Sequence, residues 1–239
     1  MICFLTSTTV LPENSGLNPA NRFVDELHEH FPSPCRALFI CSDPDSRDIT
    51  DFYTNATKAE FEKAGFPIDD IRPLDSRNEE QAAVLVRESD LIFLAGGHVP
   101  TQNRFFHKIG LCDLLKDYHG IIIGISAGSM NSAEIVYSRP EKKGEAIDPD
   151  YQRFLKGLNL TKANLLPHYQ ENKDHILDGL RIYEDIAYPD SMGRTFYAIP
   201  DGSYLFIDER KEELRGETYM ISGGIFKKIS SDGETVVLR

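Results

Sequence analysis

The chain has 239 residues, of which 41% are hydrophobic and 27% are charged, a composition typical of globular proteins and not of disordered or fibrous chains. Its 38 acidic and 26 basic side chains give a net charge of −12, which disfavours general nucleic-acid binding. No apolar run approaches the ~18 residues needed to cross a bilayer, so a membrane is not an expected partner either.

The cysteines and the amino terminus indicate the compartment. The four cysteines lie far apart, without a Cys-x-x-Cys pair, and the first residues lack the basic lead of a signal peptide. We therefore expect reduced thiols in a cytoplasmic protein, with neither a disulfide framework nor a zinc site. The length predicts a single domain over residues 1–239.

The first two thirds of the chain alternates apolar runs with helical patterns. Strands are predicted over 2–6, 37–41, 91–95 and 121–125, and helices over 21–31, about 49–64 and about 79–86. Ile49, Phe52, Tyr53 and Ala56 are expected to line the second of these helices. Unbroken apolar strands are typical of a parallel sheet that helices cover on both faces, which predicts a three-layer α/β/α sandwich.

The pattern changes after about residue 200. Short β-type runs at 204–207, 218–221, 225–229 and 236–238 are separated by turn signals such as Gly223-Gly224 and Asp232-Gly233. We expect these runs to be antiparallel strands that complete one edge of the sheet.

The most informative motif joins the strand at 121–125 to a helical segment. Gly124-Ile125-Ser126-Ala127-Gly128 has the Gly-x-Ser-x-Gly pattern of a nucleophile elbow, a tight turn that projects a serine hydroxyl above a sheet. A glycine-rich turn that happens to contain serine is the alternative interpretation. Gly96-Gly97, at the end of an earlier strand, can present a second N–H beside that of Ala127 to an oxyanion.

A serine nucleophile needs a base and an acid that orients it. Among seven histidines, His168 is favoured because it follows an apolar run ending in Pro167, where ligand-binding groups gather at a sheet edge. Asp201, in Ile199-Pro200-Asp201-Gly202, is the favoured acid, although this segment is also a common turn. Asp148 and Asp150 are rivals in a charged loop, and Glu141 and Glu145 are expected to be solvated.

These segments, in this order, resemble the dipeptidase E and cyanophycinase family of serine peptidases. The resemblance implies a fold like that of class I glutamine amidotransferases and a triad of Ser126, His168 and Asp201. It also implies oxyanion donors at Gly97 and Ala127. The family's Gly-Gly-Asn loop reads Gly-Gly-His here, which places His98 beside the substrate. The family's Glu-Thr-Arg segment, linked to recognition of an amino-terminal aspartate, has no clean match, and the nearest arginines are Arg181 and Arg194.

The leading hypothesis is a serine peptidase, monomeric or homodimeric, that hydrolyses dipeptides or other small amides and requires no metal or organic cofactor. An α/β-hydrolase esterase is a second hypothesis, but it needs the chain order Ser, acid, His. A non-catalytic binding module on an amidotransferase-like fold is a third, because a fold does not guarantee activity.

Overall fold

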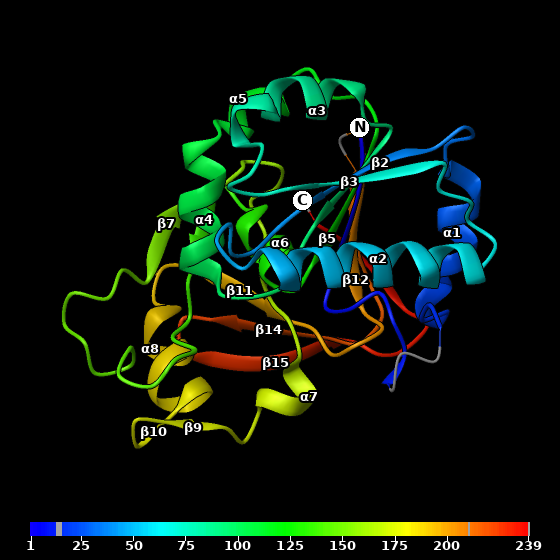
Figure 1. Cartoon of the computed structure of the whole chain (residues 1–239). Helices are drawn as coiled ribbons and strands as arrows, with labels where there is room; N and C mark the ends of the chain where they lie inside the picture. Colours follow the sequence, from blue (N-terminus) through cyan, green and yellow to red (C-terminus); the bar gives the residue numbers. More distant parts are fainter. Residues whose placement is uncertain (13–15, 210, 239) are drawn as a thin grey trace.

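Within residues 1–12, 16–209 and 211–238, which the computed structural model describes, a mixed sheet of eight strands runs through the molecule (Figure 1). Five of these strands are parallel, in the spatial order β1 (Ile2–Thr6), β5 (Ile121–Ile125), β4 (Leu91–Leu94), β2 (Arg36–Ile40) and β3 (Asp70–Leu74). Antiparallel strands extend the sheet beyond β1 in the order β12 (Tyr204–Asp208), β13 (Lys211–Arg215) and β16 (Thr235–Leu238).

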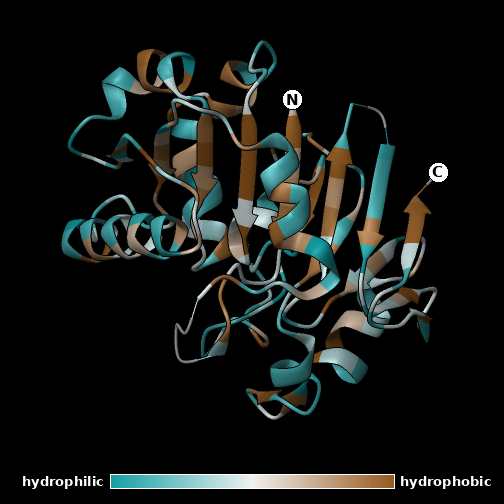
Figure 2. Ribbon diagram, turned by 90° about the vertical axis from the view of Figure 1, so that its right-hand side faces the viewer, coloured by the Kyte–Doolittle hydropathy of each residue, from teal (hydrophilic) through white to brown (hydrophobic). Residues whose placement is uncertain are grey.

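Helices cover both faces of this sheet, as the apolar strands predict. Alternate residues of a strand point to opposite faces, so Phe4 packs in one hydrophobic cluster and Leu5 in another. The cluster around Phe4 includes side chains of α1 (Phe23–His30) and α2 (Arg47–Lys63). The cluster around Leu5 includes side chains of α3 (Ala82–Glu88), α4 (Val99–Lys108) and α5 (Leu111–Leu114). Figure 2 shows the resulting contrast between hydrophobic central strands and the more hydrophilic helices outside them. The three-layer sandwich is confirmed.

Helix α2 does not bury the face expected from its sequence. Thr50, Thr54 and Phe61 are its buried residues. Ile49, Phe52 and Tyr53 are 57%, 66% and 55% exposed, so these large apolar side chains face away from the core. The helix itself is confirmed, and its core-facing side is formed by Thr50, Thr54 and Phe61.

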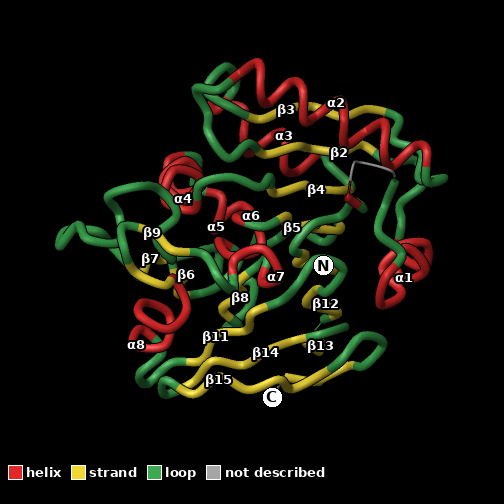
Figure 3. The backbone as a smooth tube through the Cα atoms, turned by 90° about the horizontal axis from the view of Figure 1, so that it is seen from below, coloured by secondary structure: helices red, strands yellow, loops and turns green. Residues whose placement is uncertain are grey.

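The carboxyl-terminal third also differs from the prediction. A second sheet, with four described strands, has the order β15 (Ile225–Ser230), β14 (Thr218–Ser222), β11 (Thr195–Ala198) and β8 (Asn164–Leu166) (Figure 3). The runs at 218–222 and 225–230 therefore do not extend the main sheet, and that part of the prediction was wrong. Stacked rings of Tyr219 and Phe226, with centroids 5.0 Å apart, pack these two strands over Tyr169 instead.

Short elements complete the fold. They are the 3₁₀ turns η2 (Ala20–Arg22) and η3 (Glu79–Gln81), the helix α6 (Ala127–Asn131), the strand pairs β6 (Ile135–Tyr137) with β7 (Phe154–Lys156) and β9 (Ile176–Leu177) with β10 (Leu180–Arg181), the helix α7 (Tyr169–Asn172), the π-helical turn η4 (Ile182–Ala187) and the helix α8 (Tyr188–Asp190). None of the helices in the described ranges has the length and apolar character to cross a membrane.

Candidate active site

The predicted nucleophile lies at a strained turn between β5 and α6. Ser126 has φ 48° and ψ −107°, a conformation that serine rarely adopts, and its backbone N–H donates to the Thr6 carbonyl. The turn also requires its second glycine, because a Cβ at Gly128 would lie 2.2 Å from the carbonyl oxygen of Leu94. The sequence therefore holds Ser126 at the carboxyl end of the central strand, and its side chain lines two cavities.

His168 and Asp201 meet because their strands are neighbours. Strands β8 and β11 pair in parallel, so the residues that follow them emerge at the same edge of the second sheet. His168 Nδ1 lies 2.8 Å from Asp201 Oδ1. Desolvation alone would raise the pKa of the Asp201 carboxyl, but hydrogen bonds from His168 and Ser7 outweigh it and hold that pKa below its usual value. Asp201 is therefore an anion at neutral pH, fixed against the imidazole.

A further residue of this group, Ser7, was missed by the sequence analysis. Ser7 is fully buried just after β1, and its Oγ donates to Asp201 Oδ1 at 2.5 Å. The same Oγ accepts the backbone N–H of His168 at 2.8 Å and lies 3.4 Å from His168 Nδ1. The available signal was a small polar residue directly after the first buried strand, at the edge where Ser126 also emerges.

The predicted oxyanion loop packs against the elbow. Gly97 has φ 150°, and a Cβ there would lie 2.4 Å from Ser42 Oγ, so the position requires glycine. A Cβ at Gly96 would lie 3.5 Å from the Cβ of Ser126, which shows how closely the two turns approach. Ala127 is the buried first residue of α6. The glycine loop and the first residue of α6 therefore both adjoin Ser126.

His98 lies beside the site, but both of its ring nitrogens have partners. Nδ1 lies 2.8 Å from Thr101 Oγ1 and Nε2 lies 2.8 Å from Glu145 Oε1. Desolvation lowers the pKa of His98, with a smaller contribution from Lys142, although Glu145 opposes the shift. Glu145 also accepts the backbone N–H groups of Glu141 and Lys142, so it is a structural anchor and not the solvated residue expected from its sequence.

Among the described residues, two cavities meet at Ser126 and His168. The larger, of about 510 Å³, is mostly apolar and extends outward to Ile49 and Tyr53 on α2. The smaller, of about 270 Å³, is polar and charged; its lining includes Arg139, Glu141, Glu171, Asn172 and His175.

Arg139 is the second functional candidate that the sequence analysis missed. The residue is only 5% exposed, yet its Nε and Nη1 have no hydrogen-bond partner among the described residues. Its guanidinium lies over the Tyr183 ring, 5.5 Å from the centroid. The neighbouring Glu141 is exposed, as expected from its sequence; desolvation of its carboxyl nevertheless raises the pKa of that group to about 7, although Arg139 and the Val99 backbone act against that shift. A buried cation with unpaired donors in the same cavity as Ser126 is suited to bind an anionic group.

The structure does not bring the other candidate residues to Ser126. Arg181 is exposed and paired with Asp185 at 2.6 Å, and Arg194 lies over the Phe154 ring on the wall of a different cavity. The expectation that these two arginines bind substrate stays untested, and neither lines the cavities at Ser126. Asp148 and Asp150 lie in an exposed loop, where the Asp148 carboxylate accepts the backbone N–H of Asp150 and the Asp148 carbonyl accepts that of Tyr151.

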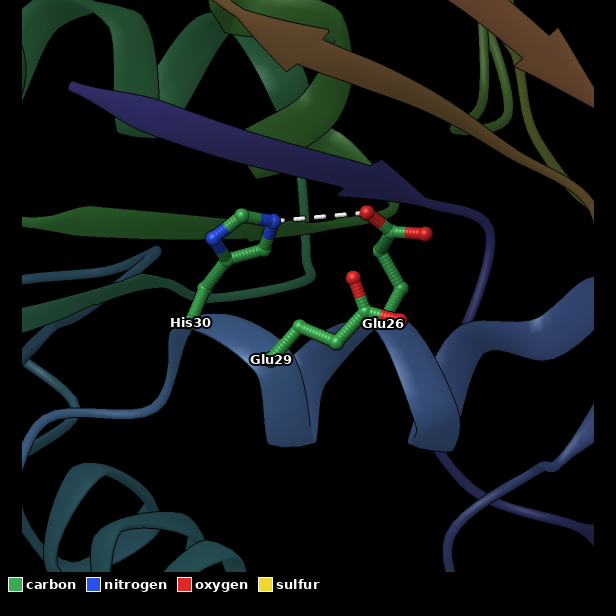
Figure 4. Close-up of side chains that lie close together, drawn as sticks. All are labelled: Glu26, Glu29 and His30. Carbon is green, nitrogen blue, oxygen red and sulfur yellow. Dashed lines mark hydrogen bonds and ion pairs between the residues drawn. The ribbon is translucent and has the colours of Figure 1, made fainter.

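Two clusters in the described part of the chain have donor atoms close enough to hold a metal ion. One is His168, Glu171 and Asp201, where a metal would compete with the His168–Asp201 contact. The other is Glu26, Glu29 and His30 on α1; Figure 4 shows Glu26 and His30 directed toward each other. Arg215 and His30 already contact the Glu26 carboxylate, so its charge is compensated without a metal.

Comparisons with known proteins identify the family and agree with the fold. The model of peptidase family S51 matches residues 3–215. A solved peptidase from an acI-B1 actinobacterium superposes with a TM-score of 0.66 at 16% identity, covering 99% of this chain and 96% of that one. A proposed peptidase E from Listeria monocytogenes EGD-e superposes with a TM-score of 0.58 at 19% identity, covering 96% and 98%. No curated protein sequence adds a match to these. Since the family model spans most of the chain, this protein belongs to peptidase family S51, a family of serine peptidases.

Proposed function

We propose that this protein hydrolyses short peptides after an acidic amino-terminal residue, with Ser126 as the nucleophile, His168 as the base and Asp201 as the orienting acid. The observation that carries the proposal is the His168–Asp201 contact of 2.8 Å on the wall of the cavities that contain Ser126. The order of these residues along the chain is Ser, His, acid, which argues against the esterase hypothesis.

The chemistry follows from the positions of the proton donors and acceptors. With Nδ1–H donating to Asp201, Nε2 of His168 is free to take the proton from Ser126 Oγ as the oxygen attacks the peptide carbonyl. Backbone N–H groups of Gly97 and Ala127 receive the oxyanion. His168 then gives the proton to the leaving amine, and a water molecule, deprotonated by the same imidazole, releases the acyl group from Ser126.

The smaller cavity supports the choice of an acidic first residue. Arg139 offers two free, buried donors for a side-chain carboxylate. Glu141 and Glu171 line the same cavity, and their carboxylates are suited to the ammonium group at the amino terminus of a peptide. An amino-terminal aspartate or glutamate carries both charges.

Labelling and hydrolysis together test this function. We expect a fluorophosphonate to label Ser126, and the wild-type protein to hydrolyse Asp-Leu amide faster than Asn-Leu amide. Ser126→Ala should lose both labelling and hydrolysis, the latter by about 10⁶-fold in kcat, the scale known for subtilisin. A folded Ser126→Ala variant with unchanged turnover contradicts the proposal. A wild-type protein that binds acidic peptides without cleaving them supports the binding-module hypothesis instead.

A further inference from the structure

The larger cavity at the nucleophile has a wall that the catalytic chemistry does not use. It runs from Ser126 and His168, over the buried rings and methyl groups of Phe39 and Ala95, to Ile49 and Tyr53 on α2. Those last two side chains are 57% and 55% exposed, although they are large and apolar. Figure 1 shows α2 as the long helix that crosses the front of the molecule.

The two cavities differ in charge and therefore suit different parts of the substrate. The smaller cavity contains Arg139 together with Glu141 and Glu171, which match the two charges of an acidic amino-terminal residue. The described lining of the larger cavity includes no lysine or arginine, and its carboxylate is Asp43. An acidic side chain therefore has no cation to meet there, and an apolar one meets Ile49 and Tyr53.

From this division we infer that the larger cavity binds the residue after the scissile bond, and that Ile49 and Tyr53 select a bulky apolar side chain at that position. The inference rests on the proposed function, and it names the second half of the substrate. Burial of the two exposed side chains against a leucine or phenylalanine removes apolar surface from water on both partners, which stabilises the complex. Asp43 repels a free carboxylate at the end of a dipeptide, so longer or amidated peptides suit the cavity better.

The test compares two substrates that differ only in the second residue, Asp-Leu amide and Asp-Ala amide. A missing methylene in an enclosed apolar pocket costs about 10- to 200-fold in kcat/KM. Because this wall is open to solvent on one side, we expect a preference for leucine of about tenfold, near the low end of that range. Ile49→Ser should reduce the preference to about threefold, and the double variant with Tyr53→Ser should bring it close to one.

Val84→Ser provides the matched control. Val84 is also an exposed β-branched residue on a helix, 43% exposed on α3, and it lines neither cavity. This variant should keep the wild-type preference, and melting temperatures of all variants report whether they remain folded.

The outcomes separate the inference from the function on which it rests. Wild-type hydrolysis with equal kcat/KM for the two amides, or a preference that survives in the double variant, overturns the inference alone. If the double variant changes the preference for the first residue, measured with Asp-Ala and Asn-Ala amides, the acyl side of the substrate lies in the larger cavity. That result overturns the inference as well. Failure of the wild-type protein to hydrolyse any of these amides refutes the proposed function, and the inference falls with it.

Discussion

Replacement of Arg139 by methionine should stabilise the protein and impair its activity at the same time. Methionine retains an unbranched apolar stem of similar reach but removes the charge. The buried guanidinium leaves Nε and Nη1 unpaired, and an unsatisfied buried donor costs about 1–3 kcal/mol. Loss of the contact with Tyr183 offsets about 0.5–2 kcal/mol of that gain. We expect a net gain of about 1 kcal/mol in the free energy of unfolding, which raises Tm by about 2–4 °C in a chain of this size.

The effect on catalysis is larger and depends on the substrate. Two charge-assisted hydrogen bonds to a substrate carboxylate contribute about 1.5–3 kcal/mol each, so their loss lowers kcat/KM for Asp-Leu amide by about 10²- to 10⁴-fold. Asn-Leu amide carries no side-chain charge and should lose less than about tenfold.

Thermal denaturation and steady-state kinetics on the two amides measure both effects. An Arg139→Met protein with a lower Tm and an equal loss on both substrates would refute the reasoning. That result would mean that Arg139 supports the fold and does not hold the substrate.

Three further predictions concern the triad and its surroundings. Asp201→Asn should lower kcat by about 10²- to 10⁴-fold, the scale of a lost triad carboxylate, whereas Asp148→Asn should change kcat by less than about tenfold. The reverse ranking in folded variants would assign the orienting acid to the loop before His168. Ser7→Ala removes a hydrogen bond to the Asp201 carboxylate, so we expect kcat to fall by about 10-fold with KM nearly constant. Recovery of kcat in Ser7→Thr but not in Ser7→Val distinguishes an effect of the hydroxyl from an effect of packing. Because the pKa of Glu141 is about 7, its carboxyl is neutral at low pH and ionised above neutrality. Glu141→Gln should therefore leave KM for Asp-Leu amide unchanged well below that pKa and raise KM about two- to fivefold above it. An equal effect on KM at both pH values would contradict a role for the charge of Glu141.

The fold and the candidate catalytic residues could largely be predicted from the sequence, because both follow strong local patterns. Each apolar run predicted a buried strand, and the glycines around Ser126 and at Gly97 marked turns where a Cβ does not fit. His168 and Asp201 could be proposed because both follow apolar runs. Their contact could not be derived, because it depends on the parallel pairing of β8 with β11, which are about thirty residues apart in the chain and separated by several short elements.

Arg139 and the exposed face of α2 show where local patterns fail. Arg139 stands between Ser138 and Pro140 in a polar stretch, and nothing in that stretch indicates that tertiary packing buries the side chain against Tyr183. The apolar residues of α2 predict a buried stripe, but a periodic pattern does not say whether the partner is the core of the protein or a ligand. In both cases the missing information is long-range contact.

The contact of Ser7 with Asp201 and His168 has a consequence for the synthesis of the protein. Ser7 is among the first residues to leave the ribosome, and Asp201 lies 194 residues later along the chain. At about 5–20 residues per second, the ribosome needs roughly 10–40 s to add the intervening segment. Ser126 and His168 are both made within that interval, before Asp201 is available to contact the imidazole. On the proposed mechanism, the nascent chain therefore has no oriented base until the second sheet has emerged and folded, and hydrolysis begins only with the finished tertiary structure.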